Sequence, residues 1–264
     1  MTSLPNVQQL FQSAQQEGLL SQASMQALNV QDLGAQIQAG LGTPLDDYGA
    51  SEVVLVTIMP DDSGSIRFAG NSATVRAGHN TVVDTLMTCP QREQILIHNR
   101  YLNGTVLYPY CPVAQAIRMD QHNYDPNRGT PLYEQTIVLL GTVLAKTQEF
   151  ADNGIPVRSV TLIISDGADE HSYRKTAEDV KAVVQDMLRT ENHIIAAMGI
   201  DDGGQTNFRQ VFRDMGIREE WILTPGNGQQ EITQAFALFS RCAMRVSQSV
   251  GNFNQMFLGG FSQP

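Results

Sequence analysis

Three largely apolar segments of strand length constrain the fold more than any other feature of this chain. They are residues 52–59 (EVVLVTIM), 158–165 (RSVTLIIS) and 193–200 (HIIAAMGI). Strands that are covered on both faces are apolar throughout, whereas half-buried strands alternate polar and apolar residues. Helical patterns separate these segments, at residues 73–89, 131–154 and 176–190. This alternation predicts an α/β domain with a doubly wound, mostly parallel sheet.

A hairpin signal predicts that one edge of the sheet is antiparallel. The segments 93–99 and 104–109 have strand-like composition, and the Asn103-Gly104 dipeptide between them is typical of a tight hairpin turn. Further along the chain a helix, a strand and a helix are predicted at residues 206–216, 220–224 and 231–247. We assign residues 49–247 to this one α/β domain.

The segments outside this domain have a different composition. Residues 1–48 are rich in glutamine, and apolar residues at spacings of three and four predict short helices that break near Gly18 and Asn29. This N-terminal helical arm either packs on the domain or docks onto a partner, and the sequence does not separate the two. Residues 248–264, rich in Gly, Asn and Phe, predict a disordered tail or a docking peptide.

Composition narrows the function classes. A net charge of −10 argues against nucleic acid and anionic membranes as partners. Cys89, Cys111 and Cys242 are widely separated and form no CxxC pair, so we expect reduced, mostly buried thiols rather than a zinc site or a disulfide framework. No basic residue precedes Arg67 and no apolar run approaches a membrane span, which predicts a cytoplasmic protein.

Oxygen-bearing side chains follow two predicted strands and precede one long helix. These side chains are Asp61, Ser63 and Ser65 after residues 52–59, Thr130 before the helix at 131–154, and Asp166 after residues 158–165. Ligands of open α/β sheets bind beyond the carboxyl ends of the strands, where such loops meet. Hard oxygen ligands without His or Cys suit Mg²⁺, Mn²⁺ or Ca²⁺. Because hydroxyl groups are neutral, an ion held by them attracts a further anionic oxygen.

The Asp-x-Ser-x-Ser sequence at 61–65, together with Thr130 and the Asp166-Gly167 pair, resembles the metal-ion-dependent adhesion site (MIDAS) of von Willebrand factor A (VWA) domains. The resemblance covers about residues 52–247 and implies a Rossmann-like sheet with one antiparallel edge strand. It also implies that Ser63, Ser65 and Thr130 approach the ion directly. Asp61 and Asp166 would hold coordinating waters or bind the ion themselves.

This resemblance implies a non-catalytic interaction module, in which a partner protein supplies an Asp or Glu carboxylate to the bound ion. The module would act as an intracellular scaffold or regulator. Small intracellular bacterial relatives are often paired with AAA-type ATPases or with stress and defence systems. The resemblance therefore implies a partner of that kind.

Two alternatives come from other classes of function. Asp61 followed by Asp62 also resembles the acidic pair of receiver-type phosphoacceptors, and a Mg²⁺-dependent phosphoryl-transfer enzyme would use Asp61 as its nucleophile. Phosphatases of the haloacid-dehalogenase type need an Asp at position 63, where this chain has Ser, and receivers need a Lys that residues 221–228 do not supply. We therefore expect no enzymatic activity. In the second alternative the arm carries the function and the ion site is vestigial.

The remaining polar residues near these loops carry weaker expectations. We expect Asp62, Asp169 and Glu170 to be solvated loop charges, and His171 to be a surface histidine that could reach the rim of the site. The polar loop 119–129 leads into Thr130, and we expect it to border the ion and to influence the choice of partner.

Overall fold

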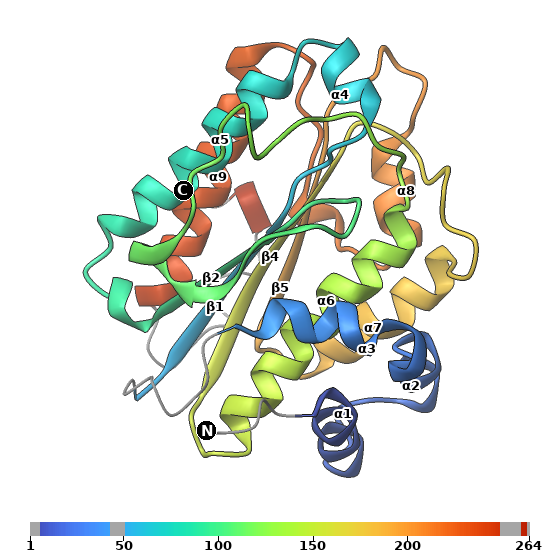
Figure 1. The fold of residues 1–264 in the computed structure, drawn as a ribbon, viewed down its shortest axis with the longest axis vertical. Helices are drawn as coiled ribbons and strands as arrows, with labels where there is room; N and C mark the ends of the chain where they lie inside the picture. Colours follow the sequence, from blue (N-terminus) through green and yellow to red (C-terminus); the bar gives the residue numbers. More distant parts are fainter. Residues whose placement is uncertain (1–5, 43–50, 249–259, 263–264) are drawn as a thin grey trace.

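The computed structural model describes residues 6–42, 51–248 and 260–262, and within them a six-stranded sheet forms the centre of the molecule (Figure 1). The strand order is β3-β2-β1-β4-β5-β6. The strands are β1 (Val53–Met59), β2 (Ile95–Arg100), β3 (Val106–Pro112), β4 (Val157–Ser165), β5 (His193–Gly199) and β6 (Ile222–Leu223). The two central strands, β1 and β4, are buried at every position, which explains why most of their residues are apolar.

All neighbouring strands pair in parallel except β2 and β3, which form the predicted antiparallel pair at one edge. After β1 the chain builds β2 and β3 on one side, and it then returns to form β4 on the other side of β1. The strand order therefore reverses between β1 and β4, and ligands of doubly wound sheets bind at such a reversal. The predicted fold class is confirmed.

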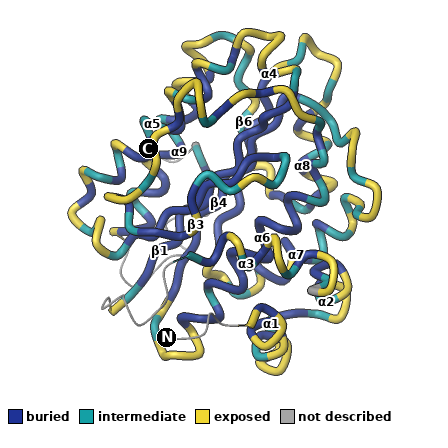
Figure 2. The backbone as a smooth tube through the Cα atoms, in the orientation of Figure 1, coloured by how far each residue is buried: buried dark blue, intermediate teal, exposed yellow. Residues whose placement is uncertain are grey.

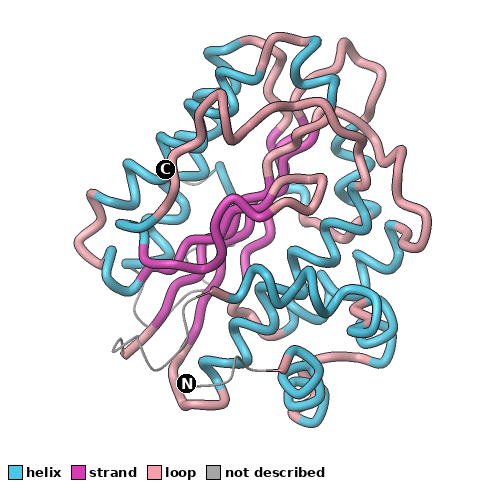
Figure 3. Tube along the Cα trace, viewed as in Figure 1, coloured by secondary structure: helices cyan, strands magenta, loops and turns pink. Residues whose placement is uncertain are grey.

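Helices cover both faces of the sheet (Figures 1 and 3). One face is covered by α5 (Ser72–Met87) and α9 (Gln229–Gln248), and the other by α6 (Leu132–Ala151), α7 (Ala177–Arg189) and α8 (Phe208–Asp214). Most of α6 is buried, because the sheet lies on its inner side and the N-terminal arm on its outer side (Figure 2). No helix in the described part of the chain is long and apolar enough to cross a membrane.

The N-terminal arm consists of α1 (Val7–Gln16), α2 (Gln22–Ala27) and α3 (Val30–Leu41), and these helices pack on α6 and α7. Phe11 and Ile37 are fully buried and belong to the main hydrophobic core. Ser24 Oγ donates a hydrogen bond to the buried Asp186 Oδ2 at 2.6 Å. The predicted breaks near Gly18 and Asn29 are present, and in this structure the arm is an additional layer of the domain.

Several local predictions are corrected by the structure. Sequence analysis missed a short helix, α4 (Gly64–Phe68), directly after the Asp-x-Ser-x-Ser residues. The strand predicted at 220–224 is only the two-residue β6, because Glu219–Trp221 forms a 3₁₀ turn instead. Further 3₁₀ turns lie at Arg92–Gln94, Val113–Gln115 and Gly260–Ser262. The three cysteines are free and buried, as predicted.

The predicted domain boundary at 48–49 lies outside the described residues, as do residues 249–259 and 263–264 of the predicted tail. Of the tail, the turn Gly260–Ser262 is described. Its Phe261 ring meets the buried Trp221 ring edge-on, with 5.2 Å between ring centroids.

Buried histidines make the stability of this fold sensitive to mild acid. Burial lowers the pKa of His79 and His193 to about 4 and that of His98 to about 3, from 6.5. Between about pH 6.5 and about pH 4 the unfolded chain binds protons that the folded protein does not. The contribution of each of these histidines to the free energy of unfolding therefore falls with decreasing pH, by up to ~1.4 kcal/mol per pH unit.

We expect His193→Gln to reduce the slope of the free energy of unfolding against pH in this window, relative to wild type. Urea unfolding followed by Trp221 fluorescence at a series of pH values between 7.5 and 4.5, roughly spanning the ionisation of histidine, measures this slope. His122→Gln on the exposed surface is the matched control. Equal slopes for His193→Gln and wild type would contradict the assignment.

Candidate functional site

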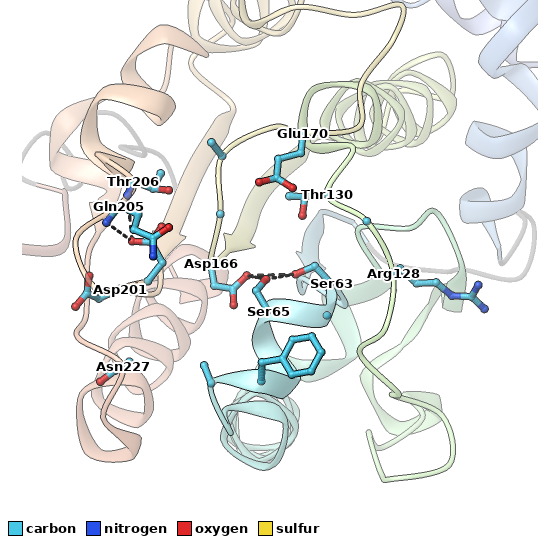
Figure 4. A pocket seen from close by; sticks show the side chains of 18 of the residues that line it. Ser63, Ser65, Arg128, Thr130, Asp166, Glu170, Asp201, Gln205, Thr206 and Asn227 are labelled. Carbon is cyan, nitrogen blue, oxygen red and sulfur yellow. Dashed lines mark hydrogen bonds between the residues drawn. The ribbon is translucent and has the colours of Figure 1, made fainter.

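The candidate site lies at the carboxyl ends of β1 and β4 (Figure 4). Met59 pairs with Ile163 near the ends of these parallel strands, so the loops that follow them leave the sheet side by side. The β1–α4 loop carries Asp61 and Ser63, and the β4–α7 loop carries Asp166. The register of two strands therefore brings together residues that are about a hundred positions apart in sequence.

Three predicted site residues form a hydrogen-bonded cluster. Ser65 Oγ donates to Asp166 Oδ1 at 2.6 Å, and Ser63 Oγ donates to the same oxygen at 3.2 Å. The two serine hydroxyl oxygens lie 2.9 Å apart. Figure 4 shows these side chains converging from the helix α4 side and from the β4–α7 loop. Two hydroxyls and a carboxylate thus face one point, as the sequence predicted.

Asp61 occupies a different position, beneath the cluster and fully buried. Its Oδ1 accepts a hydrogen bond from the Ser63 amide at 2.7 Å. Its Oδ2 accepts one from Ser165 Oγ at 2.9 Å and a longer one from the Asp166 amide at 3.3 Å. The Asp61 carboxylate therefore joins the two loops and fixes the orientation of both.

Thr130 lies on the wall of the same cavity, outside the hydrogen-bonded cluster. Its amide donates to His171 Nδ1 at 2.9 Å, and its carbonyl oxygen accepts hydrogen bonds from the amides of Glu170 and His171. His171 is exposed as predicted, and it also holds Thr130 in place. The β4–α7 loop is thereby tied to the start of α6.

A cavity of about 560 Å³ opens above these residues. Its lining includes Ser63, Ser65, Thr130 and Asp166 together with Phe68, Arg128, Glu170, His171, Asp201 and Asp202. Every predicted site residue except Asp61 lines it. Arg128 and Gly129, at the end of the polar loop 119–129, form part of its wall, so this loop borders the cavity as expected.

Burial and mutual repulsion make the two carboxylates of the site reluctant to ionise. Burial and the charge of Asp61 raise the pKa of Asp166 to about 6, and burial also raises the pKa of Asp61. In the described part of the chain, no three His, Cys, Asp or Glu side chains are placed to hold a metal. The donors are instead hydroxyls with one carboxylate at the cavity, a set that fits a hard divalent cation with water in its remaining positions.

The expectation of solvated charges was wrong for Asp62 and Asp169. Asp62 is buried, and its carboxylate accepts hydrogen bonds from the amide of Asn103, at 2.9 Å, and from the Asn103 side chain. Burial raises its pKa to about 7. Asp169 is half-buried, and its Oδ1 accepts from the Tyr133 amide at 3.1 Å, at the start of α6. Glu170 is exposed on the cavity rim, as expected.

Sequence reasoning also missed Ser165 and Tyr124 as supports of the site. Ser165 donates to Asp61, and the buried Tyr124 hydroxyl donates to the backbone oxygen of Asp61. Ser165 is the last residue of β4, so aligning the ends of β1 and β4 could have found it. Tyr124 gave a weaker signal, as an aromatic residue inside the polar loop 119–129.

Comparisons with known proteins find similar structures but no match by sequence. No family model and no curated protein matches. The pilus adhesin SpaC from Lactobacillus rhamnosus GG matches with a TM-score of 0.54 and 12% identity, over 75% of this chain and 30% of the adhesin. Proximal thread matrix protein 1 (PTMP1) from the mussel byssus matches with a TM-score of 0.50 and 16% identity, over 73% and 46% of the two chains.

A von Willebrand factor type A protein from Catenulispora acidiphila matches with a TM-score of 0.44 and 18% identity, over 74% of this chain and 43% of that protein. Identities this low show the fold alone. The strand order, the antiparallel edge pair and the flanking helices together define a VWA-like fold. The matched region spans less than a third of SpaC and less than half of PTMP1.

Asp166 provides a test of cation binding. Asp166→Asn keeps an oxygen that can accept from Ser63 and Ser65, but it removes the negative charge that faces the cavity. We expect Mg²⁺ or Mn²⁺ to raise the unfolding temperature of wild type relative to EDTA, and Asp166→Asn to abolish that rise. At a metal concentration of about 100 times Kd, the stabilisation is about 2.7 kcal/mol.

The unfolding temperatures of wild type and Asp166→Asn are measured in excess metal and in EDTA. Asp84→Asn, which removes an exposed carboxylate on α5, is the matched control and keeps the metal response. An equal metal response in wild type and Asp166→Asn would exclude Asp166 as part of the metal site.

Proposed function

We propose that this chain is a divalent-metal-dependent protein-interaction module, acting as an intracellular scaffold or regulator. The observation that carries the proposal is the convergence of the Ser63 and Ser65 hydroxyls on Asp166 Oδ1 at the floor of an open cavity. Ser65 is exposed, and Ser63, the N-cap residue of α4, makes no side-chain capping hydrogen bond, so neither hydroxyl is used to begin this helix. Oxygen donors gathered at a solvent-accessible point are typical of a binding site.

In this proposal Ser63, Ser65, Thr130 and Asp166 hold a Mg²⁺, Mn²⁺ or Ca²⁺ ion, directly or through water. Asp61 orients the two loops and adds a second negative charge beneath the ion. When bound, the ion supplies a positive charge that accepts a further anionic oxygen. The donors that face the cavity are neutral hydroxyls and the single carboxylate of Asp166, which compensate such an ion only in part, and this favours an Asp or Glu side chain of a partner protein as the additional ligand.

Two of the matched structures are described as containing metal ions. PTMP1 is described with a zinc-occupied MIDAS motif, and the TRAP protein of Plasmodium vivax is described as manganese-loaded. These metals belong to those proteins. For this chain, the choice among divalent ions rests on the oxygen donors at Ser63, Ser65 and Asp166.

The alternative, an enzyme or receiver that transfers phosphoryl groups through Asp61, has less support. A nucleophilic carboxylate must reach the substrate, whereas Asp61 is fully buried, does not line the cavity, and accepts hydrogen bonds on both oxygens. We therefore propose a non-catalytic role. The free, buried cysteines fit a reducing compartment, and we propose a cytoplasmic location. An AAA-type ATPase or a stress- or defence-system component remains the proposed kind of partner.

A partner that supplies a carboxylate to the ion should be lost when the ion is removed. We expect affinity capture from the native organism to recover the same partner in Mg²⁺ but not in EDTA, and the double variant Asp61→Ala with Ser63→Ala to lose it in Mg²⁺. Gln9→Lys with Gln16→Lys, on the exposed side of α1, tests the alternative in which the arm carries the function. If the same amount of partner is recovered with and without EDTA but less is recovered with the α1 variant, the alternative in which the arm carries the function would be supported.

Phosphoryl transfer gives a separate test. We expect no Mg²⁺-dependent turnover of an aryl phosphate and no Mg²⁺-dependent labelling by acetyl phosphate, because Asp61 is inaccessible. Release of the aryl alcohol is followed by absorbance, and labelling by intact mass. Turnover or labelling that Asp61→Asn abolishes would replace the binding role with the phosphoryl-transfer role.

A further inference from the structure

An exposed arginine lies beside the candidate ion site of this otherwise acidic protein. Arg128 lines the cavity that contains Ser63 and Asp166, and the chain as a whole carries a net charge of −10. Among the residues that the structure describes, Arg128 forms no ion pair. The charge of Arg128 acts on the buried Asp62 and opposes the rise of its pKa, but the guanidinium is not paired with that carboxylate and can still contact an incoming anion.

The backbone of Arg128 is fixed to the loop that carries the serines. Its amide donates to the Asp62 carbonyl oxygen at 3.1 Å, and its own carbonyl oxygen accepts from the Gly64 amide at 3.0 Å. Ser63 and Arg128 thus form a parallel bridge, which places their backbones about 4.8 Å apart. In Figure 4 the Arg128 side chain extends away from Ser63 and Ser65. The positively charged side chain of Arg128 therefore extends from a fixed backbone position next to the candidate ion site.

A second hollow, of about 480 Å³, adjoins the cavity on the Arg128 side. Its lining consists of Asn103, Thr105, Arg128, Gly129, Pro131 and His171. Arg128, Gly129 and His171 also line the cavity of the ion site, so these residues form a ridge between the two hollows. Among the described residues, no acidic side chain lines the second hollow. Asp62 lies beneath it, and the amide and side chain of Asn103 bind the Asp62 carboxylate.

The opposite side of the ion site has the opposite charge. Asp201 and Asp202 follow β5 and line the far wall of the cavity, whereas Glu170 lies beside Thr130, away from that wall (Figure 4). Figure 4 shows Asp201 on one side of Asp166, with Arg128 across Ser63 and Ser65 on the other. An anionic segment bound at the ion would be repelled from the Asp201 wall and attracted towards Arg128.

We propose that the partner presents two side-chain carboxylates on one extended segment, one for the ion and one for Arg128 in the second hollow. This inference rests on the proposed function of the ion site. Guanidinium and carboxylate groups can form two parallel hydrogen bonds, so a second Asp or Glu side chain on the same segment is a well-matched ligand for Arg128. The second contact forms within an already bound complex, so it adds affinity at small entropic cost.

Synthetic peptides test the proposal. Acetylated and amidated peptides carry two Asp residues separated by one to four Gly or Ser residues, which spans about 7 Å to about 17 Å in extended chains. Matched peptides replace either Asp by Asn. We expect one spacing of the two-acid series to bind in Mg²⁺ about tenfold more tightly than its one-acid counterparts. Isothermal titration calorimetry in Mg²⁺ and in EDTA measures all affinities.

Arg128→Gln should reduce the affinity of the two-acid peptide to that of the one-acid peptide. It should leave one-acid binding and Mg²⁺-induced thermal stabilisation unchanged. Arg67→Gln is the matched control, because it removes the same charge from an exposed position on α4. Arg67 stacks on Phe68 and lines neither hollow. An equal loss of affinity in both variants would show general electrostatic attraction and overturn the proposal.

The possible failures are distinguishable. Equal Mg²⁺-dependent binding of one-acid and two-acid peptides overturns the second carboxylate site and leaves the proposed function intact. Binding that is the same in Mg²⁺ and EDTA for every peptide, with no thermal stabilisation by Mg²⁺, overturns the proposed function. Thermal stabilisation by Mg²⁺ without binding of any peptide overturns the two-carboxylate proposal while retaining the metal site.

Discussion

The parallel register between β1 and β4 is the constraint on which the site depends. Pairing of Met59, the last residue of β1, with Ile163 brings Asp61, two residues beyond β1, beside Ser165 at the end of β4. Asp61 then reaches across the gap and accepts hydrogen bonds from Ser165 Oγ and the Asp166 amide. A slip of the register by one residue would reverse the faces of the side chains on β4 and separate Asp61 from these donors.

This arrangement has a cost in stability. Two carboxylates lie close together in a buried setting, and their raised pKa values show that the folded protein resists ionising them. Tyr124 and Ser165 donate hydrogen bonds to Asp61, yet no cationic side chain contacts either acid within the described residues. A site built for packing alone would not retain this repulsion. The arrangement becomes favourable when a cation compensates the charge, which couples stability to binding.

The sequence was most informative where local patterns decide the structure. Apolar runs identified β1, β4 and β5, the Asn103-Gly104 turn identified the antiparallel edge, and loop positions brought Ser63, Ser65 and Asp166 to one edge of the sheet. Features set by distant contacts could not be predicted. The burial of Asp62 depends on the hairpin turn that covers it, and the position of Asp61 beneath the cavity depends on donors from β4. Loop composition alone could not distinguish a buried acid from a solvated one.

The N-terminal arm and the ion site share the β4–α7 loop. Near its start, this loop supplies Asp166 to the cluster and His171 to Thr130. Near its end, Lys175 Nζ donates to the Ala27 carbonyl oxygen of α2 at 2.6 Å, and Arg174 lies 3.5 Å from Asp32 of α3. The loop is therefore held at both ends, by α6 on the site side and by the arm on the other. Binding groups held by surrounding contacts lose less entropy when a ligand arrives, so the packing of the arm contributes to a preformed site.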